Sequence, residues 1–344
     1  MKPAQAAVAS PPALDQLGRP LRDLRVSLID RCNLRCPYCM PREIFGADYP
    51  FLPSSAWLSF LDIERIIRAF VPLGLRKLRL TGGEPLLRPK LPELVASLAA
   101  IPELDDLALT TNGVRLEALA APLAEAGLHR VTVSLDGMSP TSVRHLSGER
   151  LRSPEPVLRG IDRARSLGLG VKVNTVVRRG VNHHEIVPLA RHFIERGLPL
   201  RFIEYMDVGN SNDWKREQVV PTKDLHAQVS EHWTLEPLEA AYRGEVARRY
   251  RVLDAAPGAE IGFVSSISEP FCRDCNRARL SAEGQLFTCL FASRGTDLRP
   301  WLPCADAELS QRLRALWSGR KDRYSEERAE GKAVQKVEMG YIGG

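Results

Sequence analysis

Three cysteines near the N-terminus carry the first chemical signal of the sequence. Cys32, Cys36 and Cys39 have the spacing C-x3-C-x2-C. Thiolates this close together can bind one iron–sulfur cluster, since such clusters take cysteine ligands. Three ligands leave one iron of a four-iron cluster open for a substrate or cofactor. A zinc knuckle would need a fourth ligand, and the first histidine of the chain is His129.

A second group of cysteines lies in the C-terminal third of the chain. Cys272, Cys275 and Cys289 have the spacing C-x2-C-x13-C, and Cys304 follows. Spacing alone leaves two interpretations open: a second three-cysteine cluster, or a four-cysteine zinc site or closed cluster that includes Cys304. The total of seven cysteines is odd, which argues against a disulfide framework and for a reducing compartment.

The first cysteine group and the later segment Gly82-Gly83-Glu84-Pro85 together resemble the radical S-adenosylmethionine (SAM) superfamily. The resemblance implies that the open iron chelates SAM, and that an electron from the cluster cleaves SAM to a 5'-deoxyadenosyl radical. Glycines allow the backbone to approach a ligand closely. The carboxylate of Glu84 can accept hydrogen bonds from the ammonium group of SAM.

The C-terminal motif is similar to the GTP 3',8-cyclase family. It comprises Phe271-Cys272-x2-Cys275-Asn276-Arg277-x-Arg279, Cys289-Leu290-Phe291 and a terminal Gly343-Gly344. This resemblance implies a lyase of molybdenum cofactor (molybdopterin) biosynthesis that converts GTP to (8S)-3',8-cyclo-7,8-dihydroguanosine 5'-triphosphate. The radical would remove the ribose 3' hydrogen, and C3' would then attack guanine C8. A second [4Fe-4S] cluster on Cys272, Cys275 and Cys289 would contact the guanine, and Cys304 has no counterpart.

The same resemblance assigns roles to single residues. The residues that would bind SAM are Tyr38, Gly83, Ser134 and Met206. Those that would bind GTP are Arg25, Arg79, Thr110, Lys172, Arg277, Ala278 and Arg279. Arg277 and Arg279 are also expected to be catalytic, together with Gly343 and Gly344 of a tail that reaches into the barrel. Without the family, Tyr38 and Met206 fit core packing equally well, and the tail fits a frayed terminus.

The sequence positions of three cations give independent support for an anionic ligand. Arg25, Arg79 and Lys172 lie in apolar runs, where a lone charge is costly. A triphosphate would compensate them; the alternative is structural ion pairs with Glu204 or Asp136. The net charge of +6 also suits an anionic small substrate. The basic stretch 312–336 contains four acidic residues and is interpreted as a solvated helix or tail, so we expect no nucleic acid partner.

Parallel strands are required to bring these residues together. Strands are predicted over 24–29, 77–80, 106–110, 130–135, 171–177 and 200–205, and helices over about 61–71, 91–100, 117–126, 154–167 and 184–196. Their alternation indicates parallel βαβ units. Chemically capable residues follow one strand after another. We therefore expect an α/β fold with a partial (βα)6 TIM-like barrel, and not an open doubly wound sheet.

Three regions are expected: a flexible leader over 1–20, a radical SAM partial barrel over 21–213, and an α+β C-terminal region over 214–344 with the second cluster and the Gly-Gly tail. The leader lacks a secretion signal, so we expect a cytoplasmic enzyme without a membrane partner. The resemblance implies an electron donor such as flavodoxin or ferredoxin and a downstream cyclic pyranopterin monophosphate synthase, and it allows a homodimer. Two rival functions stay open: another radical enzyme that modifies a peptide or cofactor, and a non-enzymatic protein with two zinc sites that binds metal or nucleic acid.

Overall fold

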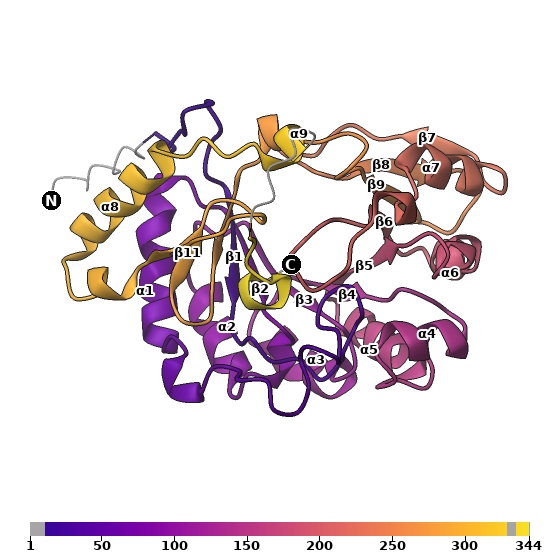
Figure 1. The fold of residues 1–344 in the computed structure, drawn as a ribbon, viewed down its shortest axis with the longest axis horizontal. Coiled ribbons are helices and arrows are strands. Elements are labelled where there is room, and N and C mark those ends of the chain that lie inside the picture. Colours follow the sequence, from indigo (N-terminus) through magenta and orange to yellow (C-terminus); the bar gives the residue numbers. More distant parts are fainter. Residues whose placement is uncertain (1–10, 329–334, 344) are drawn as a thin grey trace, which may run out of the picture.

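A curved sheet with helices along its outer side forms the centre of the protein (Figure 1). The computed structural model describes residues 11–328 and 335–343. The sheet order is β12-β11-β10-β1-β2-β3-β4-β5-β6-β9-β8-β7. The strands are β1 (Asp23–Ser27), β2 (Lys77–Thr81), β3 (Asp106–Thr111), β4 (Arg130–Ser134), β5 (Gly170–Val177), β6 (Leu200–Glu204), β7 (Leu235–Pro237), β8 (Arg248–Val252), β9 (Glu260–Val264), β10 (Arg277–Leu280), β11 (Gln285–Phe287) and β12 (Thr296–Asp297).

Helices follow most of the central strands. They are α1 (Phe60–Phe70), α2 (Leu91–Ala99), α3 (Leu116–Glu125), α4 (Pro140–Leu146), α5 (Glu155–Ser166), α6 (Ile186–Glu195), α7 (Thr222–Ser230), α8 (Asp306–Ser318), α9 (Tyr324–Glu327) and α10 (Met339–Ile342). The six predicted strands and five predicted helices are all present, with ends within two residues of those expected. Helix α4, helix α10, strand β7 and strands β10 to β12 were not predicted.

The strand order distinguishes between the two expected architectures. Strands β1 to β6 are parallel neighbours in the order of the chain. A doubly wound sheet reverses its order at a switch point, and β1 to β6 have no such reversal. The α/β fold with a large parallel sheet is therefore confirmed.

The C-terminal residues extend both edges of this sheet. Strand β10 pairs in parallel with β1, and β9 pairs in parallel with β6. The remaining C-terminal strands add antiparallel pairs outside these two. The region after residue 213 thus shares one sheet with the barrel strands, which the sequence did not predict.

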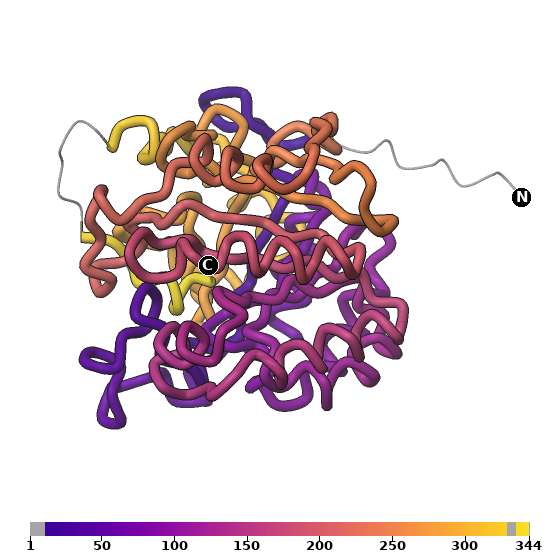
Figure 2. Tube along the Cα trace, turned by 90° about the vertical axis from the view of Figure 1, so that its right-hand side faces the viewer, coloured from indigo at the N-terminus to yellow at the C-terminus, as the bar shows by residue number. Residues whose placement is uncertain are grey.

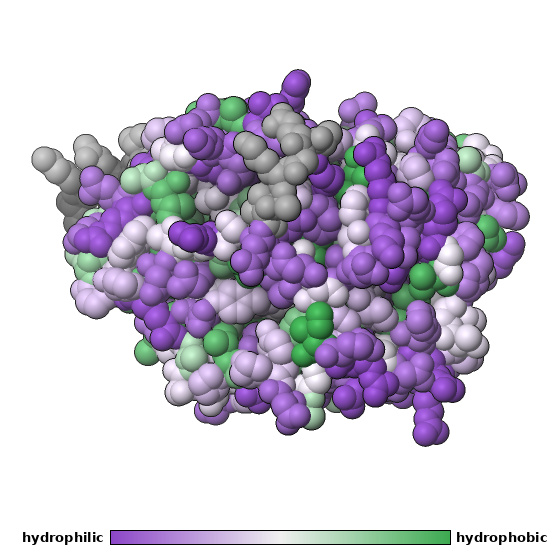
Figure 3. Space-filling view, in the orientation of Figure 1, coloured by the Kyte–Doolittle hydropathy of each residue, from purple (hydrophilic) through white to green (hydrophobic). Residues whose placement is uncertain are grey.

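The two faces of the sheet differ because side chains alternate along a strand. In β1, Leu24 and Val26 pack in the hydrophobic core with the helices, whereas Asp23 and Arg25 line a cavity on the inner face. The hydroxyl of Ser59 caps the N-terminus of helix α1, and the buried side chains of this helix face the same core. On the surface in Figure 3, apolar residues lie in small separate groups. The main apolar layer therefore lies between the sheet and the helices.

The predicted flexible leader is wrong for residues 11–20. Ala13, Asp15 and Arg19 are buried, and Arg19 forms an ion pair with Asp15 at 2.6 Å. The indole of Trp317 on α8 donates a hydrogen bond to the Arg19 carbonyl at 3.1 Å. This segment is held by buried polar contacts with the C-terminal region. Residues 1–10 lie outside the described residues.

Helix α10 brings the C-terminal end of the chain back to the barrel. Two perpendicular views place this helix within the outline of the molecule (Figures 1 and 2). Its Gly340 and Ile342 are buried. Within 11–328 and 335–343, no helix combines the length and the apolar character needed to cross a membrane.

Candidate active site

One cavity on the inner face of the sheet collects most of the residues that the sequence singled out. Its volume is about 300 Å³. Six of the seven cysteines line it, namely Cys32, Cys36, Cys39, Cys272, Cys275 and Cys289. The other predicted site residues that line it are Arg25, Tyr38, Arg79, Gly83, Thr110, Ser134, Met206, Arg277 and Arg279.

The first cysteine loop follows β1 and is held by the glycine pair after β2. The Gly83 amide donates to the Ile29 carbonyl at 2.7 Å, and the Glu84 amide donates to the Arg31 carbonyl at 2.8 Å. A Cβ on Gly83 would collide with the Arg31 carbonyl. Glycine is therefore needed here because two backbone segments touch, which is a reason the sequence analysis did not foresee.

Glu84 does not face the cavity as expected from the sequence. Its carboxylate accepts hydrogen bonds from the Leu86 amide, the Thr111 hydroxyl and the Asn112 amide, at 3.0, 2.7 and 2.8 Å. Burial raises the pKa of this carboxyl to about 7. Glu84 thus fastens the end of β3 to the end of β2, and the expected contact with the SAM ammonium is not supported.

The thiols of the first loop are buried in a way that suits a metal cluster. Burial and the neighbouring Glu84 raise the pKa of Cys32 to about 11. Burial and the other two thiols hold the pKa of Cys36 well above its usual value. These thiols ionise readily only when a metal supplies positive charge. The three residues fit a cluster.

The second cysteine group lies near the N-terminal ends of the parallel strands, opposite to the first cysteine loop, which follows the C-terminal end of β1. Cys272 and Cys275 lie just before β10, and Cys289 follows β11. Burial raises the pKa of Cys275, but the charges of Arg277 and Arg320 outweigh it and lower the pKa to about 6. Burial raises the pKa of Cys289 to about 12. One thiolate of this group is thus stabilised by protein cations.

The zinc interpretations are not supported by this arrangement. Among the described residues, no three His, Cys, Asp or Glu side chains come close enough to hold a single metal ion. A four-iron cluster binds each thiolate through a different iron, so it fits thiols that share a cavity without converging on one point. Cys304 lies before α8, outside the cavity lining, and its thiol faces the Ala305 carbonyl at 3.4 Å. A four-cysteine site that includes Cys304 is therefore wrong.

Three arginines from adjacent strands form a row across the cavity wall. Arg25 on β1 lies beside Arg279 on β10 and Arg79 on β2. Burial, followed by the charges of Arg279 and Arg79, holds the pKa of Arg25 well below its usual value. Burial also lowers the pKa of Arg79 and of Arg279 to about 10. Within the described residues none of the three forms an ion pair with a carboxylate, so the row is suited to an anionic ligand.

Carboxylates compensate a separate layer of cations at the N-terminal ends of the strands. Asp106 binds Arg130 at 2.7 Å and lies 3.5 Å from Lys77. Lys77 also lies 4.0 Å from Asp23. The charges in this layer are therefore paired, in contrast to the arginine row above it.

The expected alternative of ion pairs with Glu204 or Asp136 is wrong. Glu204 accepts hydrogen bonds from the Thr222 amide and from the Ile267 amide, at 2.7 and 2.8 Å. Asp136 accepts one from the Tyr38 hydroxyl at 2.6 Å and one from the Val176 amide at 2.9 Å. Both carboxylates are occupied away from the arginine row.

Two residues assigned to GTP have positions that limit their role. The Ala278 side chain is buried in the hydrophobic core, so only its backbone is left to contact a ligand. Lys172 lies on β5 beside Thr132 and is not among the residues that line the cavity. Burial and the charge of Arg201 lower the pKa of Lys172 to about 8.

Arg201 on β6 is a cavity residue that the sequence analysis missed. It lines the cavity, its Nε is buried without a hydrogen-bond partner, and Glu245 is 3.8 Å away. The alternation of side chains along β6 could have revealed Arg201. It lies between the core residues Leu200 and Phe202, just as Arg25 lies between Leu24 and Val26.

The glycine-rich tail enters this site. The Arg279 guanidinium donates a hydrogen bond to the Gly343 carbonyl, and Met339 and Gly340 line the cavity. Gly343 has a φ of +71°, and a Cβ there would collide with the Thr81 side chain. The described part of the tail is therefore not a frayed terminus. Gly344 lies outside the described residues.

Comparisons with known proteins agree with this geometry. Residues 26–193 match the Radical SAM superfamily, and residues 198–326 match Molybdenum Cofactor Synthesis C. A protein of Acidothermus cellulolyticus named GTP 3',8-cyclase is 51% identical over 97% of this chain and 99% of its own length. A protein of Staphylococcus aureus with the same name is 42% identical over 96% of this chain and 98% of its own length.

Solved structures show a related fold at low sequence identity. The crystal structure of Streptococcus suis SuiB has a TM-score of 0.60 and 14% identity, and the match covers 96% of this chain and 73% of that chain. The structure of SuiB bound to its precursor peptide SuiA has a TM-score of 0.60 and 15% identity, over 95% of this chain and 75% of that chain. This likeness concerns the fold alone.

Proposed function

This chain belongs to the GTP 3',8-cyclase family of the radical SAM superfamily, and from that premise we propose which of its residues carry each part of the reaction. Its function is the cyclisation of GTP in molybdenum cofactor biosynthesis. The family implies a [4Fe-4S] cluster and SAM. When bound, these supply the radical that removes the ribose 3' hydrogen of GTP, so that C3' can attack guanine C8.

On the SAM side, Cys32, Cys36 and Cys39 would hold the first cluster. Tyr38, Ser134 and Met206 would surround SAM, which their shared position in the cavity lining supports. Gly83 would keep the cysteine loop in place through its amide bond to Ile29. The buried Tyr38–Asp136 hydrogen bond of 2.6 Å would fix the tyrosine ring.

For GTP, the arginine row would bind the triphosphate. Arg25, Arg79 and Arg279 have no carboxylate partners in the described chain, and a guanidinium pairs well with phosphate oxygens. The Thr110 hydroxyl, which now accepts from Arg79 at 2.9 Å, would orient that arginine. Lys172 and the additional Arg201 would add positive charge on the β5 and β6 side.

A second [4Fe-4S] cluster on Cys272, Cys275 and Cys289 would meet the guanine at the other edge of the cavity. Arg277 lies beside this group, with its guanidinium 3.6 Å from the Cys275 sulfur, and would reach GTP from there. Arg279 and Gly343 would close the space between the two clusters. Closure would exclude water from the radical.

The observation that carries this proposal is that one cavity is lined by both cysteine groups and the unpaired arginine row. Two reactive groups must meet in one enclosed space for a radical to reach GTP. Arg277 and Arg279 lie beside the second cysteine group, and Arg279 also binds the Gly343 carbonyl. Guanidinium groups pair well with phosphate oxygens, so this arrangement fits a nucleotide triphosphate better than a peptide. It favours the cyclase over other radical enzymes.

The test is anaerobic turnover of the reconstituted protein with SAM and GTP. Wild type should carry about eight irons per chain, as two four-iron clusters require, and should form 5'-deoxyadenosine together with cyclised GTP. Cys289→Ser should lose about four irons and the cyclised product. Cys304→Ser is the matched control and should behave as wild type.

Each unexpected result would identify the part of the proposal that fails. If wild type forms 5'-deoxyadenosine but leaves GTP unchanged, the cyclisation fails. If Cys289→Ser keeps its full iron content, the second cluster fails. If wild type binds zinc and no iron, both clusters fail and the rival zinc protein is supported.

Four further properties are proposals that follow from the family. An electron donor such as flavodoxin or ferredoxin would reduce the first cluster. A cyclic pyranopterin monophosphate synthase would receive the product. A cytoplasmic location and a homodimer would complete this assignment.

A further inference from the structure

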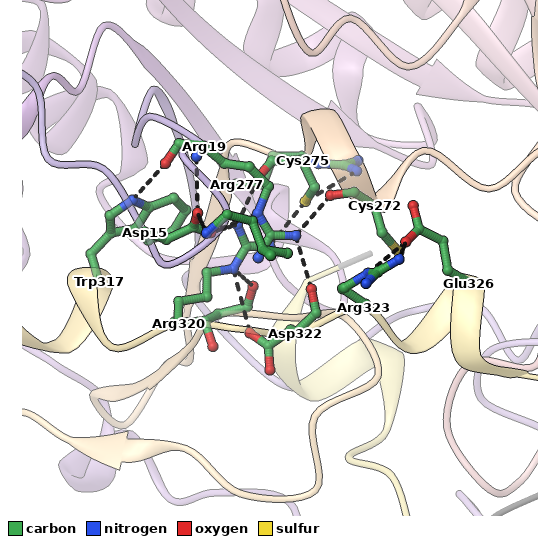
Figure 4. Close-up of polar contacts among 12 residues, drawn as sticks. Asp15, Arg19, Cys272, Cys275, Arg277, Trp317, Arg320, Asp322, Arg323 and Glu326 are labelled. Carbon is green, nitrogen blue, oxygen red and sulfur yellow. Dashed lines mark hydrogen bonds and ion pairs between the residues drawn. The ribbon is translucent and has the colours of Figure 1, made fainter. Parts of the chain in front are cut away.

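Arg320 makes close contacts with the second cysteine loop (residues 272–275), although none of the roles assigned so far involves it. It follows α8 and is 4% exposed. Its guanidinium donates to the Cys275 carbonyl at 2.7 Å and to the Cys275 sulfur at 3.2 Å (Figure 4). A third bond runs to the Thr288 carbonyl at 3.1 Å, next to Cys289. The sequence had placed this residue in a solvated helix or tail.

Two carboxylates and an aromatic ring hold Arg320 in this position. Asp15 lies 3.2 Å and Asp322 lies 3.4 Å from its guanidinium nitrogens, and its Cζ is 4.7 Å from the centre of the Trp317 ring. The side chain of Asp15 is fully buried, as is that of Arg19, with which it pairs. The guanidinium is therefore fixed before any ligand binds.

The same network holds Cys272. Arg19 donates to the Cys272 carbonyl at 2.7 Å and to the Asp322 carbonyl at 2.8 Å. Figure 4 shows Asp15 between the two arginines, which reach toward the two cysteines of the loop. Residues from both ends of the chain thus converge on one four-residue segment.

Arg277 does not replace Arg320 in this contact. Its guanidinium is farther from the Cys275 sulfur, at 3.6 Å, and stacks on Phe271 at 5.1 Å. No carboxylate of the described chain forms an ion pair with Arg277, which leaves it available to GTP. Arg320 is instead bound to two carboxylates and two carbonyls, so its charge is held next to the cysteine loop and is not available to GTP.

We propose that Arg320 is a positioning residue that orients Cys275 and raises the reduction potential of the second cluster. This inference rests on the proposed second cluster. Hydrogen bonds and positive charge at a cluster sulfur stabilise the reduced, more negative cluster, and groups behind the ligands set their orientation. Arg320 supplies both the hydrogen bond and the charge, from outside the set of residues assigned to GTP.

The test uses the full chain with Cys32, Cys36 and Cys39 replaced by serine, so that iron and electron paramagnetic resonance report the second cluster alone. The cluster is reduced by one electron with dithionite and redox mediators. Arg320→Gln keeps N–H donors without the charge, and Arg320→Lys keeps the charge without the planar fork. Arg312→Gln is the control, because Arg312 pairs with Glu308 on the surface of α8.

We expect a more negative midpoint potential for Arg320→Gln, an intermediate value for Arg320→Lys and no change for Arg312→Gln. An unchanged potential in Arg320→Gln would overturn the inference about Arg320 but would not contradict the proposed second cluster. If Arg320→Gln fails to fold or to hold iron, Arg320→Lys decides in the same way. If the unsubstituted Arg320 protein binds no iron in this background, the second cluster fails, and the inference fails with it.

Discussion

Arg25 lies between two other arginines in the middle of a parallel sheet. Arg279 and Arg79 occupy the neighbouring strand positions, and the Arg25 Nε is buried without a hydrogen-bond partner. Arg130, on the same inner face, differs because Asp106 binds it through two hydrogen bonds of 2.7 Å. Burial of a cation costs free energy unless an anion compensates it. The free energy of folding should therefore respond in opposite ways to the loss of these two arginines.

We predict that Arg25→Met stabilises the GTP-free protein and weakens GTP binding. The free energy of unfolding should rise by about 1 kcal/mol or more, since an unpaired buried polar group costs about 1–3 kcal/mol. The KM for GTP should rise by roughly tenfold or more, because a hydrogen bond to a charged group contributes about 1.5–3 kcal/mol. Denaturant unfolding and steady-state kinetics measure the two effects.

Arg130→Met is the matched control for this prediction. It leaves the partly buried Asp106 without its main partner, so the free energy of unfolding should fall by about 1–3 kcal/mol. If Arg25→Met destabilises the protein as much as Arg130→Met does, the arginine row is compensated within the protein and is not kept for a ligand.

At the scale of elements, the strands that could be predicted are those with local signals. Strands β1 to β6 show alternating or apolar runs, and each precedes a helix, so their order follows from the chain itself. Strand β10 has only four residues, and its place beside β1 depends on a contact across more than 250 positions. The alternation in Arg277-Ala278-Arg279 turns both arginines inward and Ala278 into the core, but this is evident only when the strand is known.

The tail is an element whose role the sequence could indicate only through the family. We predict that Gly343→Ala preserves both clusters and the folded state but lowers cyclisation at least tenfold. The added Cβ would collide with the Thr81 side chain, and the positive φ of +71° disfavours alanine. The tail would then leave Arg279 and open the cavity to water. Iron content, thermal unfolding and product formation test the prediction.

Gly180→Ala separates the collision from backbone strain. Gly180 has a similar φ of +77°, and nothing lies within 4 Å of the position of an added Cβ. This variant should cyclise GTP as wild type does. Deletion of Gly343 and Gly344 should match Gly343→Ala. Normal turnover in the deletion variant would remove the tail from the reaction.

The whole molecule combines a parallel sheet that could be predicted with N- and C-terminal segments whose contacts could not be predicted. The cysteine spacings and the inner-face cations are local patterns, so the sequence could assign them to one site. The buried contacts of Asp15 with Arg320 and of Arg19 with the Cys272 carbonyl could not be predicted, because each joins residues that lie more than 250 positions apart in the chain. In sequence, the N-terminal segment is rich in Ala and Pro and the C-terminal segment is rich in charge, and both compositions are also typical of solvated termini.

The pKa of Lys172 is a property of the whole barrel. Burial lowers it first, and the charges of Arg201 on β6 and Arg130 on β4 lower it further, to about 8 from the ordinary 10.5. In the GTP-free protein, the unfolded chain binds more protons between these two values, so the stability contributed by Lys172 rises with pH there. GTP binding should depend on pH in the opposite sense, because only the protonated amine attracts a triphosphate.

We therefore predict that the KM for GTP rises as the pH increases through about 8, where Lys172 loses its proton in the free enzyme. Lys172→Arg should keep a low KM to higher pH, because a guanidinium stays charged. Lys172→Met should have a raised KM at every pH. Product formation should be measured at saturating SAM between about pH 7 and 9.5, a range that lies on both sides of the Lys172 pKa of about 8. A parallel rise of KM in wild type and Lys172→Arg would assign the titration to another group and remove Lys172 from the GTP site.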